Sequence, residues 1–306
     1  GLIFEIMVEG PKKYRHIIEG FFVLVEEMLH KHSIYRGKAL DGGNNFVDVN
    51  SVSPEDVVYT SEVMRQMEAN VFSPIKHAEA LAALRQPGKR TVLFEGPYGS
   101  GKTLAALLTA QVATQNGWTF ILCRPGKDNI HQVIQTAQMY QPAVVFFEDI
   151  DVIAEAGDGS GAVTKILDTF DGLRSKGLKL LLAMTTNHVE RLHKGMVRPG
   201  RLDAIIHIGE MDRQGVEKLT KRVCGVALAD NIDFDEVFTA MTGFMPAFVK
   251  EALDRAVRYS VARNDGQVGR IDTEDLVLAA NGLRPQLCAT MAAQRTTTKA
   301  PGRRMR

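Results

Sequence analysis

Five short apolar runs between residues 72 and 209 constrain the fold of this chain more than any other feature of its sequence. Stretches with helical periodicity separate the runs, which read TVLFE (91–95), TFILC (119–123), AVVFFED (143–149), KLLLAMTT (179–186) and AIIHIG (204–209). Each run is apolar almost without a break, whereas a strand with one face in water alternates between apolar and polar residues. The pattern therefore predicts an α/β fold in which helices sandwich a mostly parallel sheet.

The segment EGPYGSGKT (95–103) follows the first apolar run and fits the pattern G-x-x-x-x-G-K-[ST]. A strand before it and a helix after it place the loop at a helix N-terminus, where free N–H groups attract phosphate. Lys102 adds a positive charge, and the Thr103 hydroxyl can ligate Mg²⁺. The segment predicts a nucleotide-phosphate site, with a chance glycine turn as the alternative. The candidate contacts are Gly96, Pro97, Tyr98, Gly99, Ser100, Gly101, Lys102, Thr103 and Leu104.

Acidic side chains follow the third run, at the end of the sheet where the phosphate loop lies. VVFFEDID (144–151) places Glu148, Asp149 and Asp151 after four apolar residues. Hydrolysis of a bound triphosphate needs an acid near Mg²⁺ and a base that orients water. A strand capped by solvated acids is the simpler alternative, but burial of unpaired carboxylates would be costly. We therefore expect these acids to belong to the phosphate site.

Two more stretches place polar side chains near the same site. AMTTNH puts Asn187 at the end of the fourth run, where its amide can hold an attacking water against the γ-phosphate. MVRPGRLD (196–203) carries Arg198 and Arg201 around a Pro-Gly turn. Such a turn keeps both arginines on an exposed corner, which suits contact with a neighbour's phosphate. Taken without the other motifs, this arginine pair would indicate ordinary surface charge.

The periodicity divides the chain into four regions. Residues 11–33 predict one helix with a broad apolar face that must pack on this chain or on a partner, and DGGNNF (41–46) predicts a flexible break. After Glu210 the pattern predicts helices at 212–225, 234–242, 246–263 and 273–281. We expect an N-terminal helical region with its linker (1–50), a large α/β domain (51–210), a small all-helical domain (211–287) and a disordered basic tail (288–306).

Composition gives little indication of a partner. The chain has 37 basic and 36 acidic residues, a net charge of +1, so its overall charge does not indicate a polyanion ligand. The three cysteines, Cys123, Cys224 and Cys288, lie far apart and are expected to be packing thiols in a reducing compartment. The most apolar early stretch contains three glutamates and is too short for a bilayer. We expect a cytoplasmic protein that does not bind membranes.

Together these motifs resemble the AAA ATPases, in the branch of the proteasomal ATPases, the membrane-bound AAA proteases and the vesicle-fusion and segregase motors. The resemblance covers roughly residues 55–285, in which AVVFFEDIDVIA, TKILDTFDGL, MTTN and VRPGRLD follow the phosphate loop in family order. FEGPYGSGKTLAA and NGWTFI are also similar to bacterial and phage members. The resemblance implies a P-loop NTPase sheet with a helical lid, ATP and Mg²⁺ as ligands, and a homo-oligomer in the form of a hexameric ring.

The resemblance also implies roles for single residues. Lys102 and Thr103 hold the phosphates and Mg²⁺, and Glu148 lies next to the metal, so that Thr103 and Glu148 are the metal-site residues. Asp149 has the position of the catalytic base, and Asn187 that of the first sensor.

Further implied roles lie at the edges of the site. The resemblance makes Arg198 and Arg201 fingers that reach the nucleotide of the adjoining subunit. It also implies two segments that contact the adenine base: Asp56, Val57 and Val58, and the small pair Pro246 and Ala247 of the lid.

The chain departs from the family in two places. The family usually reads Asp-Glu where this chain has Glu148 and Asp149, so the expected base is one methylene shorter. A misplacement of about 1 Å can slow a reaction about a hundredfold, so we expect hydrolysis to be retained but slow. The second and third strands are also joined without the family's aromatic pore loop, because only RPGKD (124–128) leads into the next helix.

Three function classes remain open from the sequence. The leading one is an ATP-driven ring that remodels a protein or nucleic acid bound through its N-terminal region. An ATP-gated scaffold with slow hydrolysis is favoured by the acid order and the short pore segment. A nucleic-acid loader or translocase would use Arg124, Lys127 and the basic tail, although solvated surface charge is the simpler explanation of those residues.

Overall fold

The computed structural model describes residues 6–151, 166–168, 170, 172, 178–189, 201–267 and 269–297. The chain divides into two compact units. The first consists of Gly1–Pro54, Glu62–Gly96 and Lys102–Ile208, and the second of Glu55–Ser61, Pro97–Gly101 and Gly209–Arg306. The second unit therefore includes the centre of the phosphate loop and the short segment Glu55–Ser61, besides the expected helical domain.

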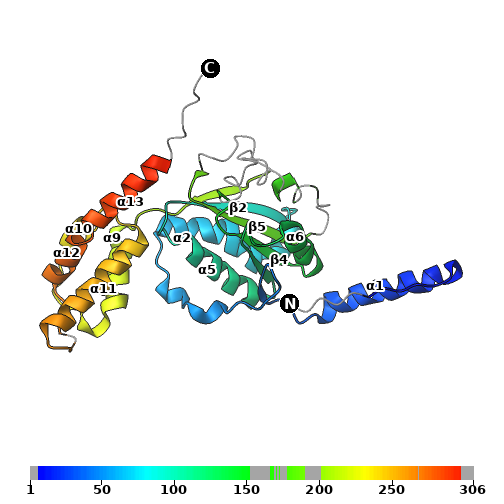
Figure 1. Cartoon of the computed structure of the whole chain (residues 1–306), viewed down its shortest axis with the longest axis horizontal. Helices are drawn as coiled ribbons and strands as arrows, with labels where there is room; N and C mark the ends of the chain where they lie inside the picture. The colour runs from blue at the N-terminus through cyan, green and yellow to red at the C-terminus, as the bar shows by residue number, and fades with distance from the viewer. Residues whose placement is uncertain are drawn as a thin grey trace, which may run out of the picture. The chain divides into compact units, whose positions relative to one another are not determined.

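The first unit is built on a parallel sheet that confirms the predicted fold class. In the described part of the chain the sheet has six strands in the order β1-β3-β4-β5-β2-β6, and all neighbouring strands pair in parallel. Figure 1 labels three neighbouring strands of this sheet, β4, β5 and β2. Their bounds are β1 (Ala39–Asp41), β2 (Lys89–Glu95), β3 (Thr119–Cys123), β4 (Ala143–Phe147), β5 (Leu180–Thr186) and β6 (Ala204–His207). Five of these strands were predicted, and β4 and β5 are buried along their whole length.

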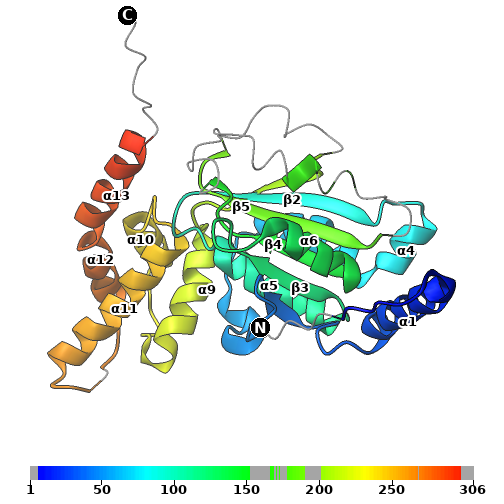
Figure 2. The same ribbon diagram turned by 45° about the vertical axis from the view of Figure 1, so that its right-hand side comes forward.

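Helices cover both faces of this sheet, as the continuously apolar strands require. On one face Val133 and Ala137 of α6 (Ile130–Met139) join a buried cluster with strand residues such as Val145 and Phe147. Helix α5 (Lys102–Gln115) packs against β3 and β4 on the other face (Figure 2). The helices shortly before β2 include α2 (Ser61–Met67), the π-helical turn Glu68–Phe72, α3 (Ser73–Lys76) and α4 (Ala78–Ala83).

The N-terminal region contains one exposed helix and one buried strand. Helix α1 (Arg15–His32) has no buried residue among those described, and Ile17, Phe21, Leu24 and Met28 are all exposed. Strand β1 instead pairs with β3 at the edge of the sheet. Part of the region expected to be separate therefore belongs to the α/β unit, because Ala39 and Leu40 are buried there.

The second unit contains the predicted helical domain. Its helices are α9 (Arg213–Cys224), α10 (Phe234–Ala240), α11 (Pro246–Arg263), α12 (Thr273–Asn281) and α13 (Arg284–Thr297), with a 3₁₀ turn at Gly225–Ala227. The first four match the predicted helices closely. Helix α13 continues past residue 288, where the sequence predicted a disordered tail, and residues 298–306 lie outside the described part of the chain.

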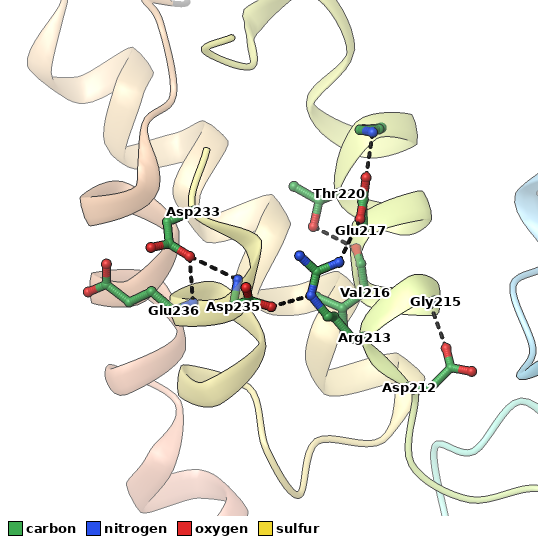
Figure 3. Close-up of polar contacts among 10 residues, drawn as sticks. Asp212, Arg213, Gly215, Val216, Glu217, Thr220, Asp233, Asp235 and Glu236 are labelled. Carbon is green, nitrogen blue, oxygen red and sulfur yellow. Dashed lines mark hydrogen bonds and ion pairs between the residues drawn. The ribbon is translucent and has the colours of Figure 1, made fainter. Parts of the chain in front are cut away.

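Aspartate caps and ion pairs define where these helices begin and how two of them are joined (Figure 3). Asp233 accepts hydrogen bonds from the N–H groups of Asp235 and Glu236 at the start of α10, each at 3.0 Å. Asp212 and Asp272 cap α9 and α12 in the same way. A cap of this kind contributes about 1 kcal/mol. Arg213 connects α9 with α10, since it donates both to Glu217 and to Asp235.

The cysteines behave as the predicted packing thiols where they are buried. Cys123 lies in the sheet and Cys224 in the helical unit, and all three cysteines are free. Burial raises the pKa of Cys123 to about 12 and that of Cys224 to about 11, so both remain protonated thiols at neutral pH. Among the helices that the structure describes, none combines the length and apolarity needed to cross a membrane.

Candidate active site

The phosphate loop joins the end of β2 to the start of α5 and depends on three glycines. Gly96, Gly99 and Gly101 have φ angles of 157°, 81° and 101°, which side chains of L-residues rarely allow. The loop ends at Lys102, the first residue of α5, so the N–H groups of the helix N-terminus are oriented into it. This geometry fits an anionic phosphate group, as the sequence predicted.

Lys102 is a buried cation that lies among acids of the same unit. Its side chain is only partly accessible, with 8% of the residue exposed, and its Nζ donates to the carbonyl of Gly96 at 2.8 Å. Burial lowers the pKa of Lys102, while the charges of Asp149, Asp151 and Glu95 act in the opposite direction. A buried ammonium at the N-terminus of a helix is suited to bind an anion.

The end of β4 turns sharply at Asp149. Asp149 has a φ of 49°, in the left-handed region that aspartate tolerates better than most residues. Its N–H donates to the Thr185 hydroxyl at 2.8 Å, and the N–H of Ile150 donates to the Thr185 carbonyl at 2.9 Å. These bonds fix the acidic segment against the carboxyl end of β5.

Asn187 lies directly after β5 and contacts two of the acids. Its Nδ2 is 3.2 Å from Oδ1 of Asp149 and 3.4 Å from Oδ2 of Asp151, and its backbone N–H donates to Asp151 at 3.4 Å. The Oδ1 atom of Asn187 is buried and has no hydrogen-bond partner among the described residues. The structure thus brings Asp149 and Asn187 together, and leaves one buried acceptor free for a ligand or water.

Asp151 belongs to this cluster, as expected for the three acids after β4, although the sequence assigned it no individual role. It is 4% exposed, and its negative charge raises the pKa of Lys102, as that of Asp149 does. Asp151 lies two residues after Asp149 in the sequence. This spacing alone does not predict the direction of its side chain, because the segment after β4 is a turn rather than a strand.

Glu148 is oriented toward a different neighbour. Its carboxylate is 3.5 Å from Nε of Arg124, which follows β3, and its backbone N–H donates to the carbonyl of Cys123. Glu148 is not among the acids that shift the pKa of Lys102. Thr103, the other expected metal residue, is exposed at the start of α5. Its metal role and that of Glu148 stay predictions.

A metal at this site would depend on the nucleotide. The described residues contain no group of three or more histidine, cysteine or acidic side chains that could hold a metal ion by themselves. Mg²⁺ is usually bound by one or two carboxylates together with substrate phosphates and waters. The available donors, an exposed hydroxyl and nearby carboxylates, fit that mode of binding.

The second unit contains the residues that were expected to contact the adenine base. The N–H of Ala247 donates to the carbonyl of Gly99 at 3.1 Å, so the small pair Pro246 and Ala247 adjoins the phosphate loop. Val57 and Val58 are buried in this unit, and Val58 lies in its core. The structure does not describe the side chain of Asp56.

Tyr59 is a loop contact that the sequence did not indicate. Its hydroxyl donates to the carbonyl of Gly101 at 2.6 Å. Ser100, also in the loop, is fully buried, and its hydroxyl oxygen has no hydrogen-bond partner among the described residues. The sequence did not indicate this role, because Tyr59 follows Val57 and Val58 directly and its pattern is that of an ordinary core residue.

The two predicted arginines differ in what the structure shows of them. Arg198 lies outside the described residues. Arg201 is half-exposed, and its Nη2 is 2.9 Å from the carboxylate of Asp168. Arg201 is therefore accessible, as the sequence predicted, but it forms an ion pair within the chain.

Comparison with known proteins agrees with this arrangement. Residues 92–210 match the model of the family described as "ATPase family associated with various cellular activities (AAA)". These residues belong to the AAA ATPase family. The matched part of this AAA domain runs from β2 through the acidic segment and Asn187 to Glu210, three residues after β6. It therefore contains Lys102, Asp149, Asp151 and Asn187.

The similarity to a curated relative extends over more of the chain than the AAA match does. Protein mac-1 of Caenorhabditis elegans is 30% identical over 272 residues, which cover 79% of this chain and 33% of that protein. The chain thus spans about one third of the length of this relative. AAA domains bind and hydrolyse ATP, generally with Mg²⁺, and commonly assemble into rings. The resemblance to bacterial and phage members stays a prediction.

Proposed function

We propose that this chain is a Mg²⁺-dependent ATPase that acts as a homo-oligomeric, hexameric ring in the cytoplasm and remodels a protein or nucleic acid. The observation that supports it best is the cluster of Lys102, Asp149, Asp151 and Asn187 at the carboxyl ends of three neighbouring strands. Ligands of open parallel sheets bind at this edge. A buried cation beside carboxylates and an unpaired amide oxygen is the arrangement that a triphosphate and its attacking water require.

The phosphate loop is the proposed binding element. Its N–H groups and the Lys102 ammonium bind the phosphate oxygens, and the glycine conformations allow the backbone to approach them. Thr103 and Glu148 would hold Mg²⁺, which when bound neutralises charge on the phosphates. Around the base, we assign contacts to Asp56, Val57 and Val58 and to the pair Pro246 and Ala247, because Ala247 already contacts the loop at Gly99.

Asn187 and Asp149 are the proposed groups that act on water. The free Oδ1 of Asn187 accepts a hydrogen bond from the attacking water and orients it. The carboxylate of Asp149, held 3.2 Å from the Asn187 amide, accepts the proton that the water loses. Asp149 has a shorter side chain than the family's usual glutamate, so we propose slow turnover unless the turn at φ 49° moves the carboxylate closer.

Arginines from a neighbouring copy are proposed to complete the site. The Arg201–Asp168 pair is exposed, with 39% and 53% of the two side chains accessible. Exposed ion pairs contribute only about 0–1 kcal/mol, so Arg201 can exchange Asp168 for a phosphate at little cost. An arginine supplied in trans accelerates phosphoryl transfer by about 10³–10⁵. We propose Arg201 and Arg198 for this role.

The substrate is proposed to bind through the N-terminal region rather than by an aromatic pore loop. The connection between β3 and α6 is a closed turn in which Asp128 accepts a hydrogen bond from the Arg124 N–H at 2.6 Å, and Gly126 has a φ of 85°. This short turn carries no aromatic residue. Helix α1 instead presents exposed apolar side chains that a partner could cover.

Two alternatives keep specific support. An ATP-gated scaffold is favoured by the Glu148–Asp149 order and by the closed turn. Its test is steady-state turnover with and without candidate protein and nucleic-acid polymers, since a scaffold would show no stimulation.

A nucleic-acid loader is favoured by the exposure of Arg124 and Lys127. Its test is a DNA titration at several salt concentrations, because phosphate contacts weaken as salt rises.

The proposal is tested by comparing two neighbouring acids. Asp149→Asn is expected to lower the ATP turnover number about 10²–10⁴-fold, the usual contribution of a general base, while ATP binding is retained. Glu148→Gln is the matched control, and it is expected to raise the Mg²⁺ concentration needed for half-maximal turnover. Hydrolysis at the parent rate in Asp149→Asn would contradict the assignment of the base.

A further inference from the structure

A cavity of about 650 Å³ lies in the first unit, at the end of the sheet opposite the phosphate loop. It adjoins the starts of β2 and β5, and Arg90 at its wall precedes Gly96 by six residues. At about 3.3 Å per strand residue, the cavity is about 20 Å from the phosphate loop. Its volume is within the range of sites that enclose small molecules. The cavity is therefore separate from the AAA site.

The walls of the cavity are mostly apolar and come from separate segments. Pro74 and Leu81 contribute from the helices before β2, Trp118 from the turn before β3, and Leu181 from β5. Trp118 is 5% exposed and is the single tryptophan of the chain. Apolar walls of this kind favour a ligand with an apolar body.

The charged side chains among the described lining residues all carry a positive charge. They are Arg85, Arg90 and Lys179, and none of the described lining residues is acidic. Lys179 is paired with Glu79, a side chain that is 86% exposed and does not line the cavity. Electrostatic complementarity therefore favours a ligand with a negative group.

Arg90 is poorly satisfied by the protein. Its Nη2 is 3.4 Å from the side-chain oxygen of Asn70, a long hydrogen bond. Its Nε is buried and has no hydrogen-bond partner among the described residues. Buried polar groups are nearly always hydrogen-bonded, and a buried N–H without an acceptor is destabilising. Arg90, which lines the cavity, therefore carries a donor for which the described residues supply no acceptor.

We propose that this cavity binds a small amphipathic carboxylate, with its apolar body against Trp118 and Leu81 and its carboxylate on the guanidinium of Arg90. A carboxylate matches the planar donor fork of arginine and can accept two parallel hydrogen bonds from it. Arg85 and Lys179 add positive charge around the same cavity. The apolar walls disfavour a fully hydrated inorganic anion, because its charge would lose water without gaining apolar contact.

The test uses octanoate as the probe and Trp118 fluorescence of the full chain as the reporter. Octanoate is expected to give a saturable fluorescence change, whereas octan-1-ol, which lacks the charge, and acetate, which lacks the chain, bind at least about tenfold more weakly. Arg90→Met is expected to weaken octanoate binding about tenfold or more, and Arg90→Lys less, because lysine keeps the charge but loses the fork. Lys102→Ala is expected to leave octanoate binding unchanged.

Several outcomes would overturn this proposal. They are no saturable change with octanoate, equal affinity for octan-1-ol and octanoate, or unchanged octanoate affinity in Arg90→Met. If Arg90→Met does not fold, Ala78→Phe, which fills the cavity from α4, must abolish the octanoate signal. If the parent chain does not bind octanoate and Arg90→Met changes the oligomeric mass, this face instead contacts a second copy.

Discussion

The backbone N–H and the side-chain amide of Asn187 both contact the carboxylate of Asp151, each at 3.4 Å. The same amide reaches Asp149 at 3.2 Å. Asp151 is 4% exposed, so its position is determined by the protein rather than by water. This relationship makes Asp151 the residue that orients the proposed sensor toward the proposed base.

Asp151→Asn is therefore expected to lower the turnover number about tenfold while ATP affinity stays close to the parent value. The physical reason is that the Asn187 amide loses a charged acceptor, and a small displacement of a catalytic group has a large effect on rate. The measurement is steady-state hydrolysis separated into turnover number and KM, together with the melting temperature. A fall in melting temperature with unchanged turnover per folded molecule would show that Asp151 only supports the fold.

Lys102 gives a prediction about pH. Burial lowers its pKa below the ordinary 10.5, so the folded protein binds fewer protons at this site than the unfolded chain between the two values. The free energy of unfolding without ATP is thus expected to rise with pH through that window and to level off above 10.5. Urea unfolding at several alkaline pH values, in the parent and in Lys102→Met, measures this contribution. A slope that persists unchanged in Lys102→Met would contradict the prediction.

Comparing Gly99, in the phosphate loop, with Gly117, between α5 and β3, distinguishes the effect of backbone strain from that of a close side-chain contact. Gly99 and Gly117 have φ angles of 81° and 73°, and a Cβ on Gly99 would lie 3.1 Å from Cβ of Ala247, whereas one on Gly117 would meet nothing within 4 Å. Alanine at either position should lower stability by about 1–2 kcal/mol, because both adopt the left-handed region. Only Gly99→Ala is expected to weaken ATP binding as well. Titration of both variants with a fluorescent ATP analogue compares them, and equal affinities would contradict the prediction.

The sequence predicted most of the fold because continuous apolar runs leave few arrangements. β3 begins and ends where its apolar run does, and α11 and α12 also match their predicted bounds. Strand β1 was not predicted, because Ala39–Asp41 is only three residues long and lies at an edge. The continuation of α13 was also not predicted, since the basic composition after residue 288 indicated disorder.

The site was less predictable because side-chain direction depends on backbone turns. The order Glu148, Asp149 placed both acids at the end of β4, but the positive φ of Asp149 sets which of them approaches Asn187. The partners of Arg201 and Tyr59 come from distant or unpatterned segments. No local periodicity carries that information.

The central claim is that ATP bound by one copy is hydrolysed with an arginine of the next. Its most direct test is ATP turnover in mixtures of two inactive chains, Lys102→Ala, which cannot bind ATP, and Arg198→Ala with Arg201→Ala, which lacks the fingers. At interfaces where the Lys102→Ala copy donates arginines to an intact loop, turnover should reappear and reach its maximum at intermediate mixing ratios. Turnover that stays absent at every ratio, or a monomer of the parent chain that hydrolyses ATP at the full rate, would contradict the account.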